Sequence, residues 1–418
     1  MEYKKLTMGG YNLHLIKTDK FKSCHIEVIF HNNVNVKDIT KRQMLTRMLN
    51  DSNKTYPTNR QMHLKLEDLY DANYYAFTSK VGNMIITNIA IDYLNPIYSE
   101  KGLSKECIKF LFDMILNPLV NLSEFDNKTF NIIKKRLKDS INSAFEDVKR
   151  LSVINALKFL GDSPSAYSNL GNINDLEEVN PNNLYEYYEE MLKNDYIDIY
   201  VIGNIEMDEI TKYINEYAKF NVIKNHKVNL QVINPKIKTK VYSDKARSIQ
   251  SNLVIVLNLN NLSDYEKRYV ANLYNLILGQ SSVQNKLFKK LREENSLCYS
   301  ISSYYQKYDG LIVISTGVDA KDENKAIKLI KECLKEMNNK ISDDEIDNAK
   351  KQVITSLLYA KDSLDRIIDN YFYQDLKELD DIDTRIKVFK KVSKEEIYDL
   401  SKRVSISIIY TLKGDNNE

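Results

Sequence analysis

The feature that most constrains the fold is that the chain repeats itself once. The predicted elements of the first half have counterparts of the same type, in the same order, in the second half. The matched pairs are strands 24–30 and 251–257, hairpins 74–91 and 302–318, helices 104–117 and 323–337, helix openings 130–137 and 346–353, and strands 197–203 and 404–410. Self-similarity at one large interval predicts two copies of one domain, because a solenoid repeats roughly every 20–50 residues.

Each copy combines β-hairpins with long helices. The turn residues Gly82-Asn83 and Asp309-Gly310 each separate two strand-like runs, and a hairpin makes its two strands antiparallel. One long helix is expected over 124–159. We therefore predict an α+β fold with two homologous domains, each a mainly antiparallel sheet with helices packed on one face. The predicted domains are 1–222 and 238–418, joined by a Lys/Asn-rich linker over 223–237.

Composition and charge exclude several functional classes. The 418 residues include 60 basic and 58 acidic side chains, a net charge of +2, which argues against nucleic acid or a membrane surface as a partner. The chain has no 18-residue apolar run and starts without an apolar segment, so we predict no membrane span, no export and a cytoplasmic location. Four widely spaced cysteines are then expected to be reduced and buried.

Two polar side chains in the second hairpin region are candidates for a binding site. The pattern predicts a helix over 287–294, a strand over 297–306, a turn at Asp309-Gly310 and a returning strand over 311–317. Arg292 ends this helix and Tyr299 comes early in the strand. Spacing alone favours structural roles, since an arginine in a last turn satisfies helix carbonyls and Tyr299 is one of 29 tyrosines.

A resemblance to a known family favours a functional role for the segment that contains Arg292 and Tyr299. The segment Leu287-Phe-Lys-Lys-Leu-Arg292-Glu-Glu-Asn-Ser-Leu-Cys-Tyr299-Ser is similar to the phenylalanine–leucine–arginine–glutamate and tyrosine–serine pattern of the pitrilysin/insulinase zinc peptidases, which include the mitochondrial processing peptidase subunits. The resemblance covers essentially the whole chain. It implies two such halves per subunit, and two subunits that close around an enclosed peptide chamber.

Three further motifs resemble a narrower bacterial branch of that family. They are Tyr56-Pro57-Thr58, Leu69-Tyr70-Asp71-Ala72 and Ile197-Asp-Ile-Tyr-Val-Ile-Gly203. This branch is associated with 5-aminopentanol modification of elongation factor P. The resemblance therefore implies a role in the maturation of that factor, although the sequence does not indicate how a peptidase-like protein would enter the pathway.

The zinc site of active family members has no counterpart in this sequence. Those members carry His-x-x-Glu-His, in which two histidines bind zinc and the glutamate activates water. The matching segment runs from Gln43 to Arg47, with Thr46 at the glutamate position. Glutamine is a poor zinc ligand, and a permanently cationic arginine cannot bind the ion. A carboxylate near the distal ligand position, Asp139, is not enough to hold zinc alone, so we predict no metal site and no cofactor.

Other ligands and nucleophiles are weaker candidates. His25 and His31 share one face of a predicted strand but lie about 20 Å apart if it is extended. His63 and Glu67 are four apart on a helix and are read as a solvated pair, because zinc needs at least three protein ligands. Cys298 has no histidine nearby in the sequence to activate its thiol. The other two histidines are His14 and His226.

The resemblance implies that Arg292 and Tyr299 contact substrate. In the family this pair faces the zinc across the chamber and binds the substrate backbone and the developing oxyanion. The expected function is a non-catalytic subunit that holds a peptide or protein substrate beside a homologous zinc-bearing partner, and that is no enzyme by itself. Two alternatives stay open: a scaffold without a substrate role, and a metallopeptidase with unrecognised ligands. A homodimer of the isolated chain also stays open.

Overall fold

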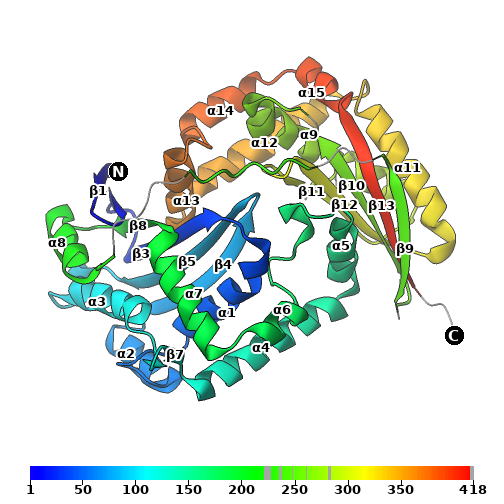
Figure 1. Cartoon of the computed structure of the whole chain (residues 1–418). Coiled ribbons are helices and arrows are strands. Elements are labelled where there is room, and N and C mark those ends of the chain that lie inside the picture. The colour runs from blue at the N-terminus through cyan, green and yellow to red at the C-terminus, as the bar shows by residue number, and fades with distance from the viewer. Residues whose placement is uncertain (221–226, 235–237, 247, 260, 281–283, 415–418) are drawn as a thin grey trace. The chain divides into compact units, whose positions relative to one another are not determined.

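A computed structural model describes residues 1–220, 227–234, 238–246, 248–259, 261–280 and 284–414. The chain divides into two compact units (Figure 1). The first contains Met1–Asn142 and Ser168–Leu230, and the second contains Ser143–Tyr167 and Gln231–Glu418. Packing therefore places residues 143–167 with the second unit, although they lie within the predicted first domain, 1–222. The predicted linker, 223–237, falls partly outside the described residues.

The first unit contains a six-stranded sheet in the order β1-β2-β8-β3-β5-β4. Its strands are β1 (Glu2–Thr7), β2 (Asn12–Lys17), β3 (Ser23–Asn33), β4 (Asn73–Val81), β5 (Met84–Leu94) and β8 (Tyr196–Gly203). All neighbours are antiparallel except β2 and β8, which are parallel. One face of β3 presents Ile26, Val28 and Phe30, all fully buried. The alternate residues of β3 include His25, Glu27 and His31, so the opposite face is polar.

Helices cover the apolar side of this sheet. They are α1 (Ile39–Leu49), α2 (Asn59–Asp68), α3 (Leu103–Leu116), α4 (Asn127–Glu146), α6 (Ile173–Glu178), α7 (Pro181–Asn194) and α8 (Met207–Tyr217). Phe220 makes edge contacts with Phe30 of β3 and Phe112 of α3, which ties helix and sheet together. Two short strands, β6 (Val120–Asn121) and β7 (Glu124–Phe125), pair with each other, and 3-10 turns lie at Val36–Asp38 and Pro96–Tyr98.

The second unit contains a five-stranded sheet in the order β11-β12-β10-β13-β9. Its strands are β9 (Lys240–Ala246), β10 (Ser251–Leu259), β11 (Ile301–Gln306), β12 (Leu311–Val318) and β13 (Val404–Gly414). Only β13 and β9 are parallel. Both sheets are thus mixed but mainly antiparallel, and the predicted α+β fold class is confirmed. The central β10 pairs with a hairpin strand and with the last strand, as β3 does in the first unit.

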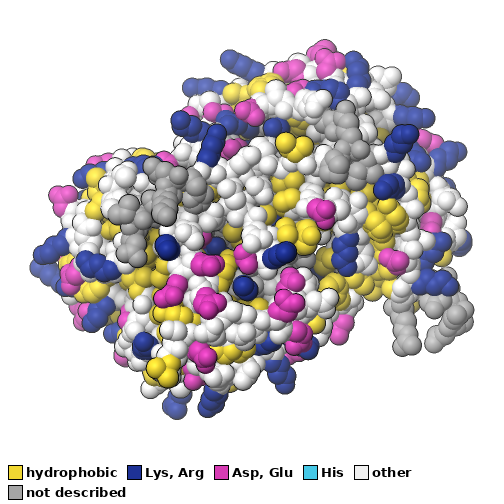
Figure 2. Space-filling view, in the orientation of Figure 1, with side chains coloured by type: hydrophobic (Ala, Val, Ile, Leu, Met, Phe, Trp, Pro, Cys, Tyr) yellow, Lys and Arg dark blue, Asp and Glu magenta, His cyan; other side chains and the backbone are white. Residues whose placement is uncertain are grey.

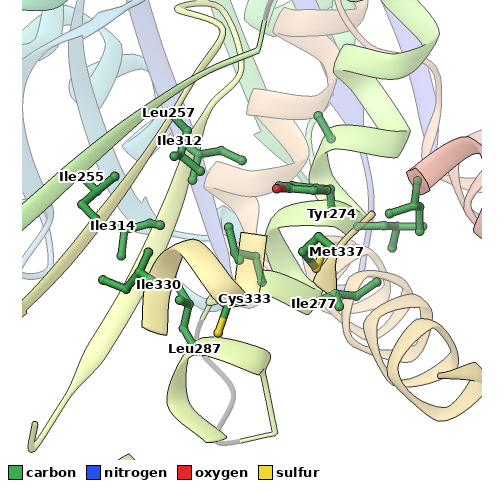
Figure 3. Packing of buried hydrophobic residues seen from close by; sticks show 14 of the residues in the cluster. Ile255, Leu257, Tyr274, Ile277, Leu287, Ile312, Ile314, Ile330, Cys333 and Met337 are labelled. Carbon is green, nitrogen blue, oxygen red and sulfur yellow. The ribbon is translucent and has the colours of Figure 1, made fainter. Parts of the chain in front are cut away.

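The core of the second unit lies between this sheet and a group of helices. The helices are α9 (Ala271–Leu278), α10 (Lys286–Phe288), α11 (Glu323–Glu336), α12 (Asp343–Ala360), α13 (Leu364–Asp375), α14 (Ile382–Lys391) and α15 (Lys394–Ser401), with π-helical turns at Glu266–Val270 and Lys289–Glu293 and 3-10 turns at Pro164–Ala166 and Ala320–Asp322. Figure 3 shows Ile255, Leu257, Ile312 and Ile314 of the sheet against Ile330 of α11. Burial of this many branched apolar side chains is the main driving force for the unit.

The second sheet is covered on its other face by α5 (Val148–Lys158), which belongs in sequence to the first half (Figure 1). Ala156 of this helix joins a cluster with Val254, Val256 and Ile408, which alternate with the residues of the main core. Asn155 donates a hydrogen bond to the hydroxyl of Tyr410, with 3.1 Å between Nδ2 and Oη. The predicted placement of helices on one face therefore has one exception in this unit.

The existence of α5 corrects the prediction of a single helix over 124–159. The helix is interrupted at Asp147, whose backbone adopts φ −73° and ψ 100°. The Asp147 carboxylate accepts a hydrogen bond from the backbone N–H of Arg150 and so starts a new helix as an N-cap. The two helices are separated by this one residue, and apolar residues such as Phe145 and Val148 lie on both sides of it, which is why the sequence pattern did not reveal the break.

The second hairpin also differs from its prediction. Gln306 pairs with Leu311, so the connection has four residues rather than the two of an Asp-Gly turn. The ammonium group of Lys307 donates to the carbonyl of Glu378 at 2.9 Å, and Asp309 accepts a hydrogen bond from the hydroxyl of Ser165 at 2.5 Å. These tertiary bonds hold the longer loop, in which a glycine still provides the positive φ.

The surface charge and the apolar content of the helices are relevant to the predicted lack of nucleic-acid and membrane partners. Basic and acidic side chains are interspersed on the face shown in Figure 2, with no large area of one sign. Among the helices of the described residues, none is both long and apolar enough to cross a bilayer. The predicted lack of nucleic-acid and membrane partners, and the cytoplasmic location, stay predictions.

One glycine is required by the close approach of two strands, and this generates a prediction. Gly203 ends β8 with φ +150°, and a Cβ there would lie 2.6 Å from Sγ of the buried Cys24. Gly203→Ala is expected to lower the free energy of unfolding by about 2 kcal/mol or more, because both the backbone and the contact are unfavourable for alanine. Urea denaturation measures the loss. Gly9→Ala is the control, since its Cβ would meet no atom within 4 Å; equal effects of the two substitutions would contradict the packing argument.

Candidate functional site

Arg292 lies in a π-helical turn. The predicted helix over 287–294 is present as α10 followed by the π-turn Lys289–Glu293. The turn closes with a bond from the N–H of Glu294 to the carbonyl of Lys289. Single π-turns are rare and often mark functional positions, because they displace one side chain from the helical register.

Tyr299 does not lie in a strand, which corrects the sequence prediction. β11 begins at Ile301, and the predicted strand start at residue 297 is wrong. The N–H of Leu297 donates to the carbonyl of Leu291, so this backbone follows the end of the helix instead of the neighbouring strand. Pairing with β12 starts only where Ile301 faces Thr316, whose hydroxyl donates to the carbonyl of Ser300.

The structure brings Arg292 and Tyr299 together. The guanidinium carbon of Arg292 lies 5.3 Å from the centre of the Tyr299 ring, a cation–π distance. One Nη1–H of Arg292 donates to the carbonyl of Cys298 at 3.0 Å, which fixes the side chain beside the loop. Arg292 is half-buried, whereas Tyr299 is 81% exposed. The pair thus presents a planar cation and a phenol that are held by the protein and accessible to a ligand.

Cys298 lies between these two residues in sequence but offers no nucleophile. Its side chain is buried, and burial raises the pKa of the thiol, an effect that a hydrogen bond with Thr316 reduces. A thiol with a raised pKa stays protonated at neutral pH and is a weak nucleophile. The expectation of a structural cysteine agrees with this environment. All four cysteines are free and buried.

Gln43, the first residue of the segment compared with the zinc motif, is a structural hydrogen-bond donor. Gln43 lies on α1 and is 7% exposed. Its Nε2 donates to the carbonyl of Thr78 on β4 at 3.2 Å and to the carbonyl of Asn169 at 2.7 Å. The amide nitrogen therefore joins a helix, an edge strand and a loop. An amide nitrogen does not bind a metal ion, and the amide oxygen of a glutamine is not among the usual zinc ligands.

The other two motif positions also lack metal chemistry. The hydroxyl of Thr46 contacts the carbonyl of Arg42 at 2.8 Å and the hydroxyl of Thr78 at 2.7 Å. Arg47 is half-buried in the last turn of α1, and burial lowers the pKa of its guanidinium. Asp139, at the distal position, lies on the exposed side of α4. No group at Gln43, Thr46 or Arg47 can both bind zinc and activate water.

Sequence reasoning missed a buried ion pair beside this motif. Arg42 and Asp195 are almost fully buried, and Nη1 lies 2.7 Å from Oδ2. The Nε–H of Arg42 donates to the hydroxyl of Tyr187 at 2.9 Å. Although burial alone would lower the pKa of Arg42, the charge of Asp195 and the contact with Tyr187 raise it. These contacts fix α1 against the end of α7, and no periodic pattern in the sequence indicated them.

The histidines form hydrogen bonds that the sequence also did not predict. Asp198 accepts from His14 at 3.1 Å and contacts Nε2 of His31 at 2.8 Å. Burial would raise the pKa of Asp198, but the two histidines hold it well below its usual range. His25 contacts Asp92 instead, at 2.6 Å. Alternation along the strands places these side chains on one face of the sheet. Their hydrogen bonds could be predicted only with the strand order β2-β8-β3.

Of the remaining two histidines, the structure describes one. His63 and Glu67 are both exposed on α2, in agreement with the expected solvated pair. His226 lies outside the described residues.

The chain is similar to known proteins in both sequence and structure. A family model described as peptidase M16 inactive domain matches residues 178–353, a range that contains Arg292 and Tyr299. A Bacillus subtilis (strain 168) protein named probable inactive metalloprotease YmfF is 23% identical over 412 residues, covering 97% of this chain and 96% of that protein.

Two solved structures share the fold over nearly their whole length. A conserved protein from Enterococcus faecalis V583 has a TM-score of 0.94 at 24% identity, covering 100% of this chain and 99% of that one. A peptidase M16 inactive domain from Pseudomonas fluorescens has a TM-score of 0.80 at 15% identity, covering 99% and 98%. Residues 178–353 therefore match the family model of the peptidase M16 inactive domain, and the chain as a whole shares its fold with these solved structures.

Proposed function

We propose that this protein is a non-catalytic M16 subunit that binds a peptide or protein substrate through Arg292 and Tyr299. A homologous subunit would supply the zinc ion and cut the peptide. The main support for the proposal is the difference between residues 43–47, which lack zinc ligands, and the pair of Arg292 and Tyr299. Gln43 and Thr46 in the motif segment form structural hydrogen bonds and Arg47 is a cation, while Arg292 is held beside Tyr299, whose ring is exposed.

The proposed lack of zinc binding follows from the side chains at residues 43, 46 and 47, which do not provide the ligands that zinc needs. Zinc catalysis needs three protein ligands, an open position and a base for the bound water. The side-chain amide of Gln43 donates to two backbone carbonyls, and the hydroxyl of Thr46 donates to the carbonyl of Arg42. Arg47 adds a positive charge where a divalent cation would have to bind. The name of the Bacillus subtilis relative, probable inactive metalloprotease, supports the same conclusion for this chain.

The substrate-binding role rests on the chemistry of the retained pair. Once one N–H of the guanidinium is committed to Cys298, the other donors of Arg292 are still available for a carbonyl or carboxylate. The phenol of Tyr299 adds a donor on the exposed side. β11 starts two residues later and, among the strands that the structure describes, pairs with β12 alone. An extended peptide can add to such an edge by backbone hydrogen bonds.

The biological setting that we propose is the 5-aminopentanol modification of elongation factor P. Its support is the resemblance of the segments Tyr56-Pro57-Thr58, 69–72 and 197–203 to the branch associated with that pathway. The zinc-bearing homologue is proposed on the same basis.

The first prediction concerns metal content. Purified chain dialysed at neutral pH is expected to retain far less than one zinc per molecule and to show no peptidase activity, because the positions that match the motif offer no ligand set. Inductively coupled plasma mass spectrometry measures the metal, with a zinc-bearing M16 homologue prepared in parallel. Stoichiometric zinc together with activity would instead establish a metallopeptidase with unrecognised ligands.

The second prediction concerns the arginine–tyrosine pair. In the complex reconstituted with the zinc-bearing homologue, Arg292→Ala combined with Tyr299→Phe is expected to lower kcat/KM for peptide cleavage about 10- to 100-fold, through loss of charge-assisted hydrogen bonds. Lys289→Ala, an exposed cation on the same π-turn, and Tyr359→Phe, an exposed phenol on α12, are the matched controls.

Assembly is checked by size-exclusion chromatography of every variant. Unchanged cleavage by an intact complex carrying the double substitution would contradict the substrate-binding role and favour a scaffold. A loss that the two controls reproduce would show that the effect is not specific to the pair.

A further inference from the structure

The second unit contains a cavity of about 510 Å³ where β10 ends. Its lining residues come from the segment 231–234, the last two residues of β10, the segment 261–267 and the loop 308–310 of the second hairpin. All of them belong to the second unit. Sites for small molecules have volumes of roughly 300–1,000 Å³, so the cavity has room for such a ligand.

Hydrogen bonds fix the walls of this cavity. The backbone N–H groups of Val232 and Leu259 donate to the carbonyls of residues 308 and 310 at 2.8 and 2.9 Å. The side-chain amide of Asn234 donates to the carbonyl of residue 309 at 2.6 Å. Each carbonyl of the loop 308–310 therefore has a donor from a neighbouring wall. The cavity is thus preformed and needs no ligand to hold it open.

Asn258 lines the cavity with a side chain that the described part of the chain leaves unsatisfied. The residue is 5% exposed, and its Nδ2 is shielded from solvent without a hydrogen-bond partner. By alternation along β10 it shares a sheet face with Val254 and Val256, which are apolar. Asn234, in the same lining, has the bonds that a structural asparagine is expected to form. An unpaired buried amide lowers stability, so Asn258 indicates a partner outside the fold.

The same cavity contains a weakly paired cation. Nζ of Lys267 lies 3.7 Å from a carboxylate oxygen of Asp264, whose side chain is 81% exposed. Such a surface pair is weak and is screened by salt. The other charged residue of the lining, Asp309, accepts a hydrogen bond from the hydroxyl of Ser165 at 2.5 Å. Lys267 is therefore the charged group of the lining that is best able to bind a ligand.

The rest of the contact surface is largely apolar. Val232, Leu259 and Leu262 contribute to the lining, and so does Ile233, which is 94% exposed. A ligand with a hydrocarbon part would cover these side chains and remove apolar surface from water. Apolar walls with a small number of polar groups are typical of small-molecule sites.

We propose that this cavity binds a small apolar monocarboxylate, held by Lys267 and Asn258. Rotation about χ2, a broad torsion in asparagine, turns Nδ2 of Asn258 from its shielded position toward the cavity. Two N–H donors, one of them charged, match the oxygens of one carboxylate. A single ammonium group among apolar walls suits one negative charge on an apolar body better than a phosphate. The inference does not depend on the proposed function, since the site uses neither Arg292 nor Tyr299.

The test is equilibrium dialysis of the full-length protein against radiolabelled hexanoate. Hexanamide removes the charge of this probe, acetate removes its hydrocarbon chain, and inorganic phosphate is a plain anion; each is used as a competitor. The variants are Asn258→Leu, Lys267→Met and Ile233→Asp. Lys351→Met is the matched control, because Lys351 is an exposed cation on α12 that does not line the cavity.

The wild type is expected to bind one hexanoate per chain, with hexanamide and acetate at least about 10-fold weaker. Asn258→Leu and Lys267→Met should each raise the Kd for hexanoate about 10-fold, through loss of a donor to the carboxylate. Ile233→Asp should raise it similarly, because it places a negative charge at the cavity. Lys351→Met should leave the Kd unchanged.

Three results would overturn the inference: no saturable binding of hexanoate by the folded wild type, equal affinity for hexanamide, or an unchanged Kd in both Asn258→Leu and Lys267→Met. Displacement of hexanoate by phosphate at a similar concentration would also overturn it, since the site would then be an unselective anion site.

Urea denaturation without ligand separates a binding role of Asn258 from a structural one. Asn258→Leu is expected to unfold at an unchanged or higher urea concentration, because it removes a shielded amide that has no partner. Asn234→Leu is expected to unfold at a lower concentration, because it removes the bonds that hold the loop 308–310. An equal loss of stability in the two variants would assign Asn258 to the fold and overturn the inference.

Discussion

The second sheet depends on having both faces buried. Val254, Val256 and Ile408 alternate along their strands with residues of the main core, so each strand carries two apolar faces. The helices that lie between its strands in sequence cover one face, and α5 covers the other. Without α5 that face would expose a continuous apolar surface of the kind that drives association. The two sequence halves are therefore not two separable folding units, although they are repeats.

Much of the fold could be predicted because hydrophobic periodicity and turn residues are local signals. The duplication, the fold class, both hairpins and most helices follow from them. The break at Asp147 was missed because one polar residue separates two helices that both contain apolar side chains. The start of β11 was misplaced because Leu297 and Cys298 have strand-like side chains, while their backbone bonds go to the preceding helix.

The candidate site could be predicted only in part, for a related reason. The difference between residues 43–47 and a His-x-x-Glu-His motif can be seen in the sequence, and Arg292 and Tyr299 are close in sequence. The ion pair of Arg42 with Asp195 and the histidines around Asp198 join residues from strands and helices far apart in the chain. Their pairing depends on strand order, which includes a parallel neighbour that no local pattern indicates.

The interruption at Asp147 has a consequence for synthesis on the ribosome. The apolar side of α5 packs against β13, the last strand of the chain, so its final contacts wait for about 250 further residues. At roughly 5–20 residues per second that delay is on the order of 10–50 s. During this interval the apolar side chains of α5 lack the sheet that covers them, which would make the emerging chain a client for a chaperone that acts during translation.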